Sequence, residues 1–189
     1  MTHPKQLALP LPSRAAQGRE DFYVTTANAL AVAQIEGWQI WPSRKLVLSG
    51  PSGAGKTHLA HVWAGLTGAR ILRAATLAEA DIPKLAEGPV CVEDVEAIAG
   101  DRANEEALFH LHNLLMEQGY YLLLTAQRPP AHWGLSLPDL QSRMMAAQAV
   151  QLHQPDDDLL SALIATHNME LAARMDRQVR LEQGKVTPA

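Results

Sequence analysis

Residues 50–57 have the types and spacing of a phosphate-binding loop. They read Gly-Pro-Ser-Gly-Ala-Gly-Lys-Thr and match the pattern G-x-x-x-x-G-K-[S/T] at every fixed position. In such a loop, glycines let backbone N–H groups point at phosphate oxygens, the lysine reaches the β- and γ-phosphates, and the threonine hydroxyl ligates Mg²⁺. We therefore predict that the loop binds ATP or ADP together with Mg²⁺. The predicted contacts are Gly50, Ser52, Gly53, Ala54, Gly55, Lys56 and Thr57, with Thr57 also a metal ligand.

A pair of acids follows a second apolar run and could complete the metal site. Residues 89–92 are apolar and lead directly into Glu93 and Asp94. Phosphoryl transfer needs an acid at the tip of a strand beside the phosphate loop, where it holds Mg²⁺ and orients water. We assign Glu93 to the metal side and Asp94 to the water side, both as catalytic residues, although the sequence leaves this division of roles open. The competing interpretation is that both acids are solvated in a loop.

The elements that must position these residues follow from the order of apolar runs. Short apolar runs bounded by turn residues predict strands, and longer runs with a 3.6-residue period predict helices. The predicted strands are 45–49, 70–74, 89–95, 120–125 and 149–153. The predicted helices are 26–37, capped by Thr25 or Thr26, then 56–65, 77–85, 104–118, 139–146 and one starting at 156. Strands that alternate with helices predict an α/β fold, a three-layer P-loop NTPase with a five-stranded parallel sheet.

Composition limits the class of protein. With 189 residues, 47% of them hydrophobic and 19% charged, the chain is long and apolar enough for one globular domain. A net charge of −4 argues against a protein that holds DNA mainly by its own basic surface, so we expect DNA to be contacted mainly through partners. The single Cys91 excludes an internal disulfide framework. Because no signal peptide or membrane-spanning run is evident, we expect a cytoplasmic protein without membrane contact.

Four segments in chain order resemble the AAA+ domain of the DnaA replication initiator. They are 50–59 (GPSGAGKTHL), 92–95 (VEDV), 124–130 (LTAQRPP) and 140–143 (LQSR). The corresponding family segments end in GKTHL or read like IDDI, TSDRPP and LxSR. The resemblance covers roughly residues 20–164 and implies an AAA+ core at 22–164.

The resemblance also implies roles for individual residues. His58 lies beside the nucleotide, Asn28 lies where the adenine pocket begins, and residues 125–127 lie where the family places its γ-phosphate sensor, with Gln127 in place of an acid. Arg143 matches the arginine finger, a catalytic residue that reaches the ATP held by a neighbouring DnaA molecule. The competing interpretation of Arg143 is a surface arginine in a salt bridge.

The N-terminal residues 1–21 are predicted to form an extended tail. Within it, Gln6-Leu7-Ala8-Leu9-Pro10-Leu11 resembles the QLxLPL peptide with which Hda-like members of this family bind the β sliding clamp. Three leucines project from an extended, proline-stiffened segment, and a glutamine amide can hydrogen-bond, so Gln6, Leu7, Leu9 and Leu11 could dock in an apolar groove. Alternatively, the tail packs on the domain itself.

Together, these segments imply an Hda-like regulator that binds ADP or ATP, docks on the clamp, and promotes hydrolysis of DnaA-bound ATP. Such an activity is negative regulation of replication initiation. We expect weak or absent ATPase activity of the chain itself, because the acid pair reads Glu93-Asp94, the sensor turn carries Gln127 and the family's lid arginine is missing. A homo-oligomer stays open.

Residues 165–189 depart from this pattern, because the family's helical lid and its arginine are missing or replaced. The segments 165–168 (ATHN) and 180–186 (RLEQGKV) resemble instead the end of LolD-type ABC transporter ATPases, which closes in a hairpin. This leaves as alternative an autonomous P-loop ATPase of ABC type with His167 at the γ-phosphate, although no LSGGQ-type signature is present. A third hypothesis is a partner adaptor whose nucleotide is only structural.

Overall fold

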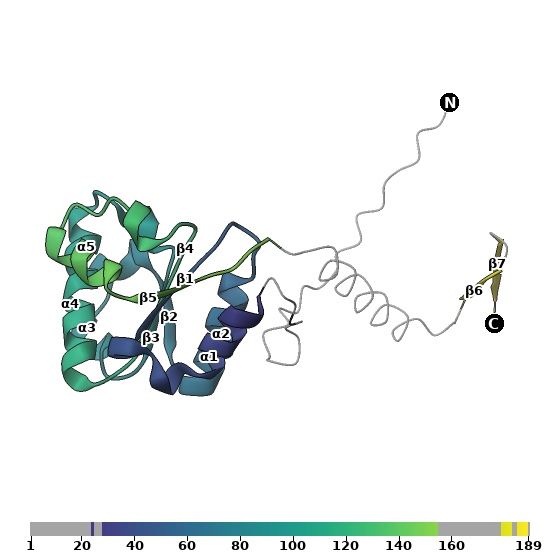
Figure 1. The fold of residues 1–189 in the computed structure, drawn as a ribbon, viewed down its shortest axis with the longest axis horizontal. Helices are drawn as coiled ribbons and strands as arrows, with labels where there is room; N and C mark the ends of the chain where they lie inside the picture. The colour runs from purple at the N-terminus through teal and green to yellow at the C-terminus, as the bar shows by residue number, and fades with distance from the viewer. Residues whose placement is uncertain (1–23, 25–27, 155–178, 183–184, 189) are drawn as a thin grey trace, which may run out of the picture.

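The computed structural model describes residues 24, 28–154, 179–182 and 185–188, and its main feature is a five-stranded parallel sheet (Figure 1). The strand order is β2-β3-β4-β1-β5, and every pairing is parallel, as predicted. The strands are β1 (Lys45–Ser49), β2 (Arg70–Arg73), β3 (Val90–Glu93), β4 (Leu122–Ala126) and β5 (Gln148–Gln151). The central strands β1 and β4 are buried along their whole length, which explains their continuous apolar runs.

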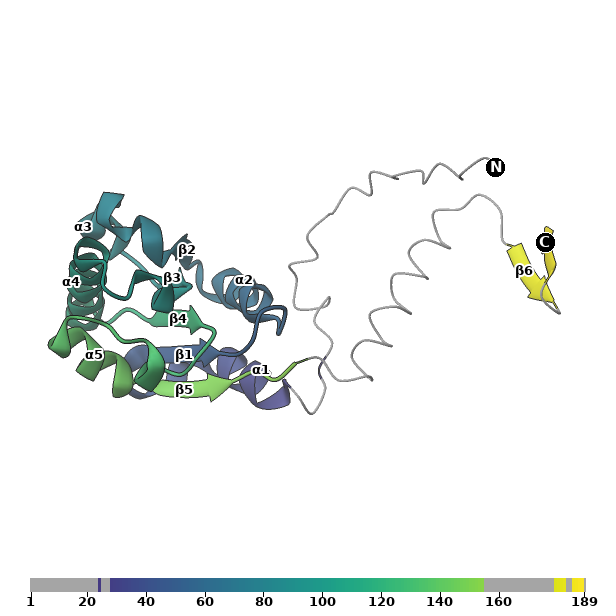
Figure 2. The same cartoon turned by 90° about the horizontal axis from the view of Figure 1, so that it is seen from above.

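Helices cover both faces of the sheet and make the third layer of the predicted α/β fold (Figures 1 and 2). One face carries α1 (Ala29–Glu36) and α2 (Lys56–Thr67), and the other carries α3 (Ile82–Leu85), α4 (Arg102–Gln118) and α5 (Pro138–Met145). Alternation along β1 divides the core: Leu46 and Leu48 face α1 and α2, whereas Val47 faces the other helices. The connections include the 3₁₀ turns Trp38–Ile40, Pro42–Arg44, Ala74–Glu79, Val95–Ile98 and Pro130–His132.

Within the described residues, the predicted elements are present with bounds that differ by one or two residues at most, except at two places. Strand 45–49 has the predicted bounds, whereas α1 begins at Ala29 with Asn28 as its N-cap, so the predicted cap at Thr25 or Thr26 is wrong. The predicted helix 77–85 is also wrong. It is a 3₁₀ turn followed by the short α3, whose first turn contains Pro83 and is capped by the Asp81 carboxylate, which accepts from the Lys84 N–H at 3.2 Å.

Near the C-terminus, β6 (Val179–Glu182) pairs antiparallel with β7 (Lys185–Pro188), within the segment whose sequence resembles the end of LolD-type ATPases. The tail 1–21, the helix predicted from 156 and the segment 165–178 lie outside the described residues. Within the described part of the chain, no helix has the length and apolar character needed to cross a bilayer.

Candidate nucleotide-binding site

The phosphate loop connects the end of β1 to the start of α2, and its first residue must be glycine. The Gly50 N–H donates to the Ala126 carbonyl of β4 at 3.2 Å, and the Leu152 N–H donates to the Ser49 carbonyl at 2.7 Å. A Cβ added to Gly50 would lie 2.6 Å from the Leu152 carbonyl oxygen. Because this contact is to backbone, a larger residue at position 50 would displace the segment that directly follows β5.

The loop turns into α2 through a second glycine with a special conformation. Gly55 is the N-cap of α2 and has φ of 93°, in the left-handed region that L-residues with a side chain rarely adopt. Lys56 is then the first residue of α2. The positive end of the helix dipole and the free N–H groups of its first turn therefore face the loop, where they favour an anion such as phosphate.

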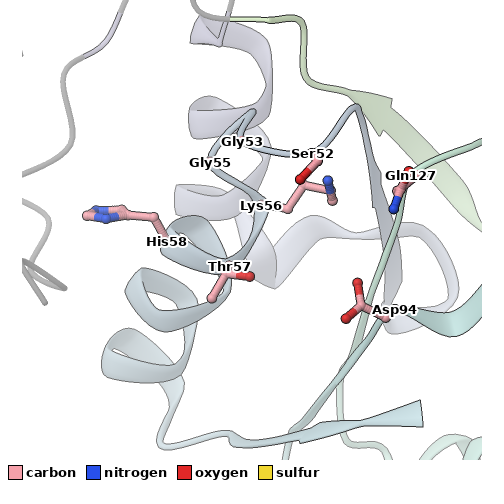
Figure 3. Close-up of a pocket in the computed structure, with 8 residues that line it drawn as sticks. All are labelled: Ser52, Gly53, Gly55, Lys56, Thr57, His58, Asp94 and Gln127. Atoms are coloured by element: carbon pink, nitrogen blue, oxygen red, sulfur yellow. The ribbon is translucent and has the colours of Figure 1, made fainter. Parts of the chain in front are cut away.

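A polar cavity of about 310 Å³ lies against this loop (Figure 3). Its lining residues are Ser52, Gly53, Gly55, Lys56, Thr57, His58, Asp94 and Gln127. The predicted contacts Gly50 and Ala54 do not line the cavity. They shape the loop instead, where the Ala54 N–H donates to the Pro51 carbonyl at 3.3 Å. The structure thus brings most of the predicted nucleotide contacts to one hollow.

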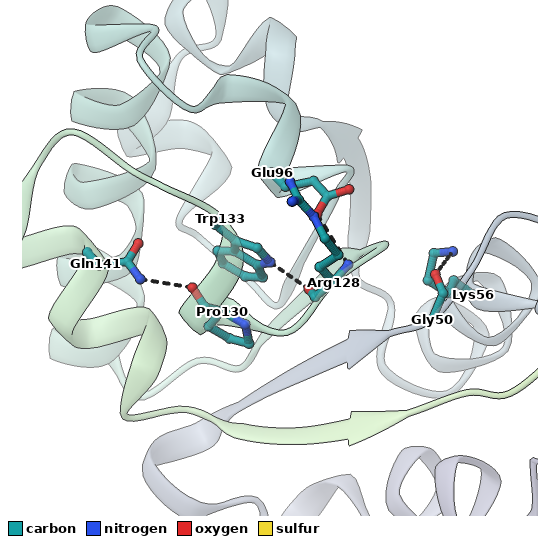
Figure 4. A network of polar contacts seen from close by, with 7 residues as sticks. All are labelled: Gly50, Lys56, Glu96, Arg128, Pro130, Trp133 and Gln141. Atoms are coloured by element: carbon teal, nitrogen blue, oxygen red, sulfur yellow. Dashed lines mark hydrogen bonds and ion pairs between the residues drawn. The ribbon is translucent and has the colours of Figure 1, made fainter.

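The Lys56 ammonium forms hydrogen bonds with the phosphate loop itself. Its Nζ donates to the carbonyls of Gly50 at 2.6 Å and Pro51 at 2.8 Å, the first of which is drawn in Figure 4. Burial lowers the pKa of Lys56, while the nearby carboxylates, Asp94 foremost, act in the opposite direction and raise it. Both carbonyl partners are neutral, so a phosphate oxygen would be a stronger acceptor for the same ammonium.

The two predicted acids occupy different environments. Asp94 lines the cavity, and Figure 3 shows its carboxylate facing the hydroxyl of Thr57. Its backbone has φ of 58°, a left-handed conformation that costs about 1–3 kcal/mol, and its N–H donates to Thr125 Oγ1 at 3.3 Å. Glu93 ends β3 and does not line the cavity, but its Oε1 is buried and has no hydrogen-bond partner among the described residues. These oxygens suit Mg²⁺, which prefers carboxylate and hydroxyl ligands, so the residues present fit the ion.

Gln127 is a cavity residue that the sequence indicates only as part of the predicted sensor turn. Gln127 follows β4, and the carboxyl ends of neighbouring parallel strands meet at one edge of the sheet. This place after a strand end is the sequence feature that could identify Gln127 as a site residue. Its neighbour Arg128 anchors the turn: the backbone N–H and Nε of Arg128 each donate to Glu96 Oε2 at 3.2 Å. Figure 4 shows this pair between the turns that follow β3 and β4.

Two further hydrogen bonds hold the same turn, one within the loop and one that connects it to α5. The indole N–H of Trp133 donates to the Arg128 carbonyl at 2.7 Å, and Gln141 Nε2 of α5 donates to the Pro130 carbonyl at 2.8 Å (Figure 4). Trp133 is buried. A series of side chains therefore joins the edge of the cavity to α5.

Arg143 lies outside the cavity, exposed on α5. Its guanidinium carbon is 5.1 Å from the ring centroid of Phe109 on α4. The Arg143 carbonyl accepts a hydrogen bond from Lys45 Nζ. Lys45 is the first residue of β1, whereas the phosphate loop follows Ser49, the last residue of the same strand. The structure thus separates Arg143 from the phosphate loop of its own chain.

The remaining predicted site residues are placed as follows. His58 lines the cavity, and Figure 3 shows its imidazole directed away from Asp94 and Gln127. Asn28 is buried, occupies the N-cap position of α1 and does not line the cavity. The predicted clamp contacts Gln6, Leu7, Leu9 and Leu11 lie outside the described residues.

Comparison with known proteins confirms the fold. No protein-family model matches the chain. Among solved structures, a DNA replication initiation factor shares 21% identity with a TM-score of 0.71, over 82% of this chain and 55% of its own. AMPPCP-bound DnaA from Aquifex aeolicus shares 20% identity with a TM-score of 0.67, over 82% of this chain and 56% of its own.

Domain III of the Thermotoga maritima replication initiation protein DnaA shares 21% identity with a TM-score of 0.66, over 82% of this chain and 73% of its own. The chain spans about half the length of the first two of these proteins. This likeness shows that the described core has the AAA+ type of P-loop NTPase fold, as the sequence predicts.

Proposed function

We propose that the chain is an Hda-like negative regulator of replication initiation. It binds ADP or ATP with Mg²⁺ at residues 50–57, docks on the β sliding clamp through residues 6–11, and promotes hydrolysis of ATP bound by DnaA. Its own ATPase activity is weak or absent, and it contacts DNA mainly through these partners.

The observation that carries the proposal is the position of Arg143. This arginine is exposed, sits on a helix that is held by buried side chains, and does not line its own chain's cavity. An arginine supplied in trans stabilises the charge on a transferring phosphoryl group and accelerates GTP hydrolysis about 10³–10⁵-fold in GTPases. Arg143 is therefore available to the nucleotide of another molecule.

Nucleotide binding by the chain itself is supported by the cavity and by one structural neighbour. Lys56 and the start of α2 provide positive charge to the hollow, and Thr57, Asp94 and Glu93 provide the oxygens that Mg²⁺ prefers. The DnaA structure from Aquifex aeolicus, which has the same fold, holds the nucleotide AMPPCP.

Weak turnover of the chain's own nucleotide is supported by the sensor turn. Gln127 lines the cavity where the resembling family carries an acid, and a lid arginine is not recognisable in the sequence. The chain then acts as a nucleotide-bound regulator, and its own nucleotide sets the shape of the core.

Clamp docking is supported by the sequence of residues 6–11. Single residues separate the three leucines, so in an extended conformation they would lie on one face and fit a shallow apolar groove, while Gln6 hydrogen-bonds at its end.

The test is an omission experiment with purified components. DnaA loaded with ATP is mixed with clamp-loaded DNA and the chain, and ADP formation is followed. We expect acceleration only when the chain and the clamp are both present, and we expect deletion of residues 1–12 to abolish both acceleration and retention of the chain by immobilised clamp. Acceleration or clamp retention that persists after the deletion would contradict the clamp role. Multiple-turnover hydrolysis by the isolated chain would favour the autonomous ATPase instead.

A further inference from the structure

A buried polar cluster lies beneath α5 and is not part of the nucleotide site. Lys45 and His112 are only 5% and 2% exposed. Lys45 Nζ lies 3.3 Å from His112 Nε2 and donates to the Arg143 carbonyl at 2.8 Å. On its other side, His112 Nδ1 lies 3.2 Å from Asn113 Oδ1, so a proton on Nδ1 leaves Nε2 free to accept from the lysine.

Lys45 is an unusual residue for the first position of a central strand. Burial, and after it the positive charge of Arg143, lower the pKa of its ammonium. No carboxylate forms an ion pair with Lys45 within the described ranges. Burying an ammonium costs free energy, and two neutral acceptors offset that cost only in part. We therefore ask what the hydrogen bond to the Arg143 carbonyl contributes to the structure.

That contact completes the C-terminal end of α5. The helix ends at Met145, and the carbonyls of a helix's last turn lack partners within the helix and carry partial negative charge. The lysine satisfies the carbonyl of Arg143, so the backbone from which the guanidinium projects is anchored to the sheet.

A second contact holds the other end of the Arg143 side chain. Its guanidinium carbon lies 5.1 Å from the ring centroid of Phe109, a half-buried residue of α4. A cation over an aromatic face is attracted by the ring's charge distribution. The backbone of Arg143 is therefore held by Lys45 of β1, and its guanidinium is held by Phe109 of α4. Figure 2 shows β1, α4 and α5 as neighbours.

We propose that Lys45 and Phe109 are positioning residues that preset Arg143 for a phosphoryl group held by another protein. The proposal rests on the trans role of Arg143 given above. Presetting matters because a long exposed side chain otherwise loses rotamer freedom each time it engages its target.

The test compares substitutions that remove each contact with one that keeps it. Phe109→Leu keeps an apolar side chain but removes the ring, whereas Phe109→Tyr keeps the ring; Lys45→Met keeps the length but removes the donor. In the DnaA hydrolysis assay, we expect Phe109→Leu and Lys45→Met to lower the maximal rate about tenfold without changing the half-saturating concentration of the chain. Phe109→Tyr should stay within about twofold of wild type. Equal maximal rates for the Leu and Tyr variants would overturn the proposal.

A second measurement does not involve DnaA. The NMR order parameter of the Arg143 Nε–H bond reports motion of the side chain on the picosecond to nanosecond time scale. We expect it to be higher than that of the exposed Arg73 in wild type, to fall in Phe109→Leu and Lys45→Met, and to persist in Phe109→Tyr. An order parameter that is unchanged by both the Leu and the Met substitution would overturn the positioning role.

Failure of the wild-type chain to accelerate ATP hydrolysis by DnaA would overturn the proposed function, so the two failures are separable. Phe109 is half-buried, so the Leu and Tyr pair keeps the test valid if Lys45→Met does not fold.

Discussion

The phosphate loop and helix α5 are stabilised in contrasting ways, although both are next to β1. The loop follows the last residue of β1, and α5 contacts its first residue, Lys45. The loop is rich in glycine, and within the described residues the ammonium of Lys56 donates hydrogen bonds to carbonyls of its own loop. Asp94 faces the cavity from a strained, left-handed backbone. These features leave charged groups available to a ligand.

Helix α5, by comparison, is held at both ends by charged side chains that are buried. At its start, the Glu105 carboxylate accepts from Ser136 and from the Leu137 N–H, and at its end Lys45 holds the Arg143 carbonyl. The two regions are held by separate residues, and the proposed roles in nucleotide binding and in the presentation of Arg143 are therefore expected to be separable. Substitutions should therefore affect one without the other.

The largest expected effect is on the buried Glu105. Its two oxygens accept four hydrogen bonds, from the N–H and hydroxyl of Ser136 and the N–H groups of Gly100 and Leu137, at 2.8–2.9 Å. Glu105→Gln places an amide donor against two of these donors, so we expect the free energy of unfolding to fall by about 3 kcal/mol. Urea denaturation measures it. The matched control is Glu106→Gln, an exposed neighbour paired with Arg102, which should cost less than about 1 kcal/mol. Equal losses would show that the start of α5 is not held by Glu105.

The next effect is on nucleotide affinity. Lys56→Ala removes the ammonium that faces the cavity, and we expect ADP affinity to fall about a hundredfold, because hydrogen bonds to charged groups contribute about 1.5–3 kcal/mol. Calorimetric titration measures it. Arg143→Ala should leave ADP affinity within about twofold of wild type, since Arg143 does not line the cavity. Loss of ADP binding in Arg143→Ala would break the separation between the two regions.

A smaller effect concerns pH and the cluster under α5. Burial, as the main cause, lowers the pKa of His112 to about 4 from 6.5. The histidine is therefore neutral in the folded chain while the unfolded chain binds a proton below pH 6.5. Its contribution to stability is complete above pH 6.5 and is lost as pH falls toward 4, about 2 kcal/mol of it by pH 4.5.

The measurement is the free energy of unfolding at pH 7 and pH 4.5. His112→Gln should remove about 2 kcal/mol of the difference between the two pH values, whereas His110→Gln, on the exposed side of the same helix, should retain it. A pH difference that is the same in all three proteins would refute the assignment.

The smallest effect is at the strained acid beside the cavity. Because Asp94 has a left-handed backbone, Asp94→Gly should be about 1 kcal/mol more stable than Asp94→Ala, which lacks the same carboxylate but keeps a Cβ. Urea denaturation of the two variants decides it. Greater stability of the alanine variant would show that position 94 is not left-handed.

Some of this organisation is predictable from sequence and some is not. The phosphate loop and β1 are local patterns, since glycine spacing and the short apolar run 46–48 before it are sufficient to recognise them. The contacts that hold α5 are not local: Lys45 and Arg143 are 98 residues apart, and Glu105 reaches Leu137 across 32. A buried lysine at a strand start and a buried glutamate in a helix's first turn look like ordinary surface residues until the fold brings their partners together. The start of α1 was mispredicted because neighbouring Thr and Asn residues are all good caps.

The most direct measurement follows labelled nucleotide in a single turnover. DnaA is loaded with α-³²P-labelled ATP and the chain with unlabelled ADP, so that labelled ADP forms only at the site of the partner. With clamp-loaded DNA, we expect wild type and the exposed-arginine control Arg73→Ala to accelerate labelled ADP formation equally, and Arg143→Ala to show no acceleration. Acceleration by Arg143→Ala at the wild-type rate would contradict the role of Arg143 in trans.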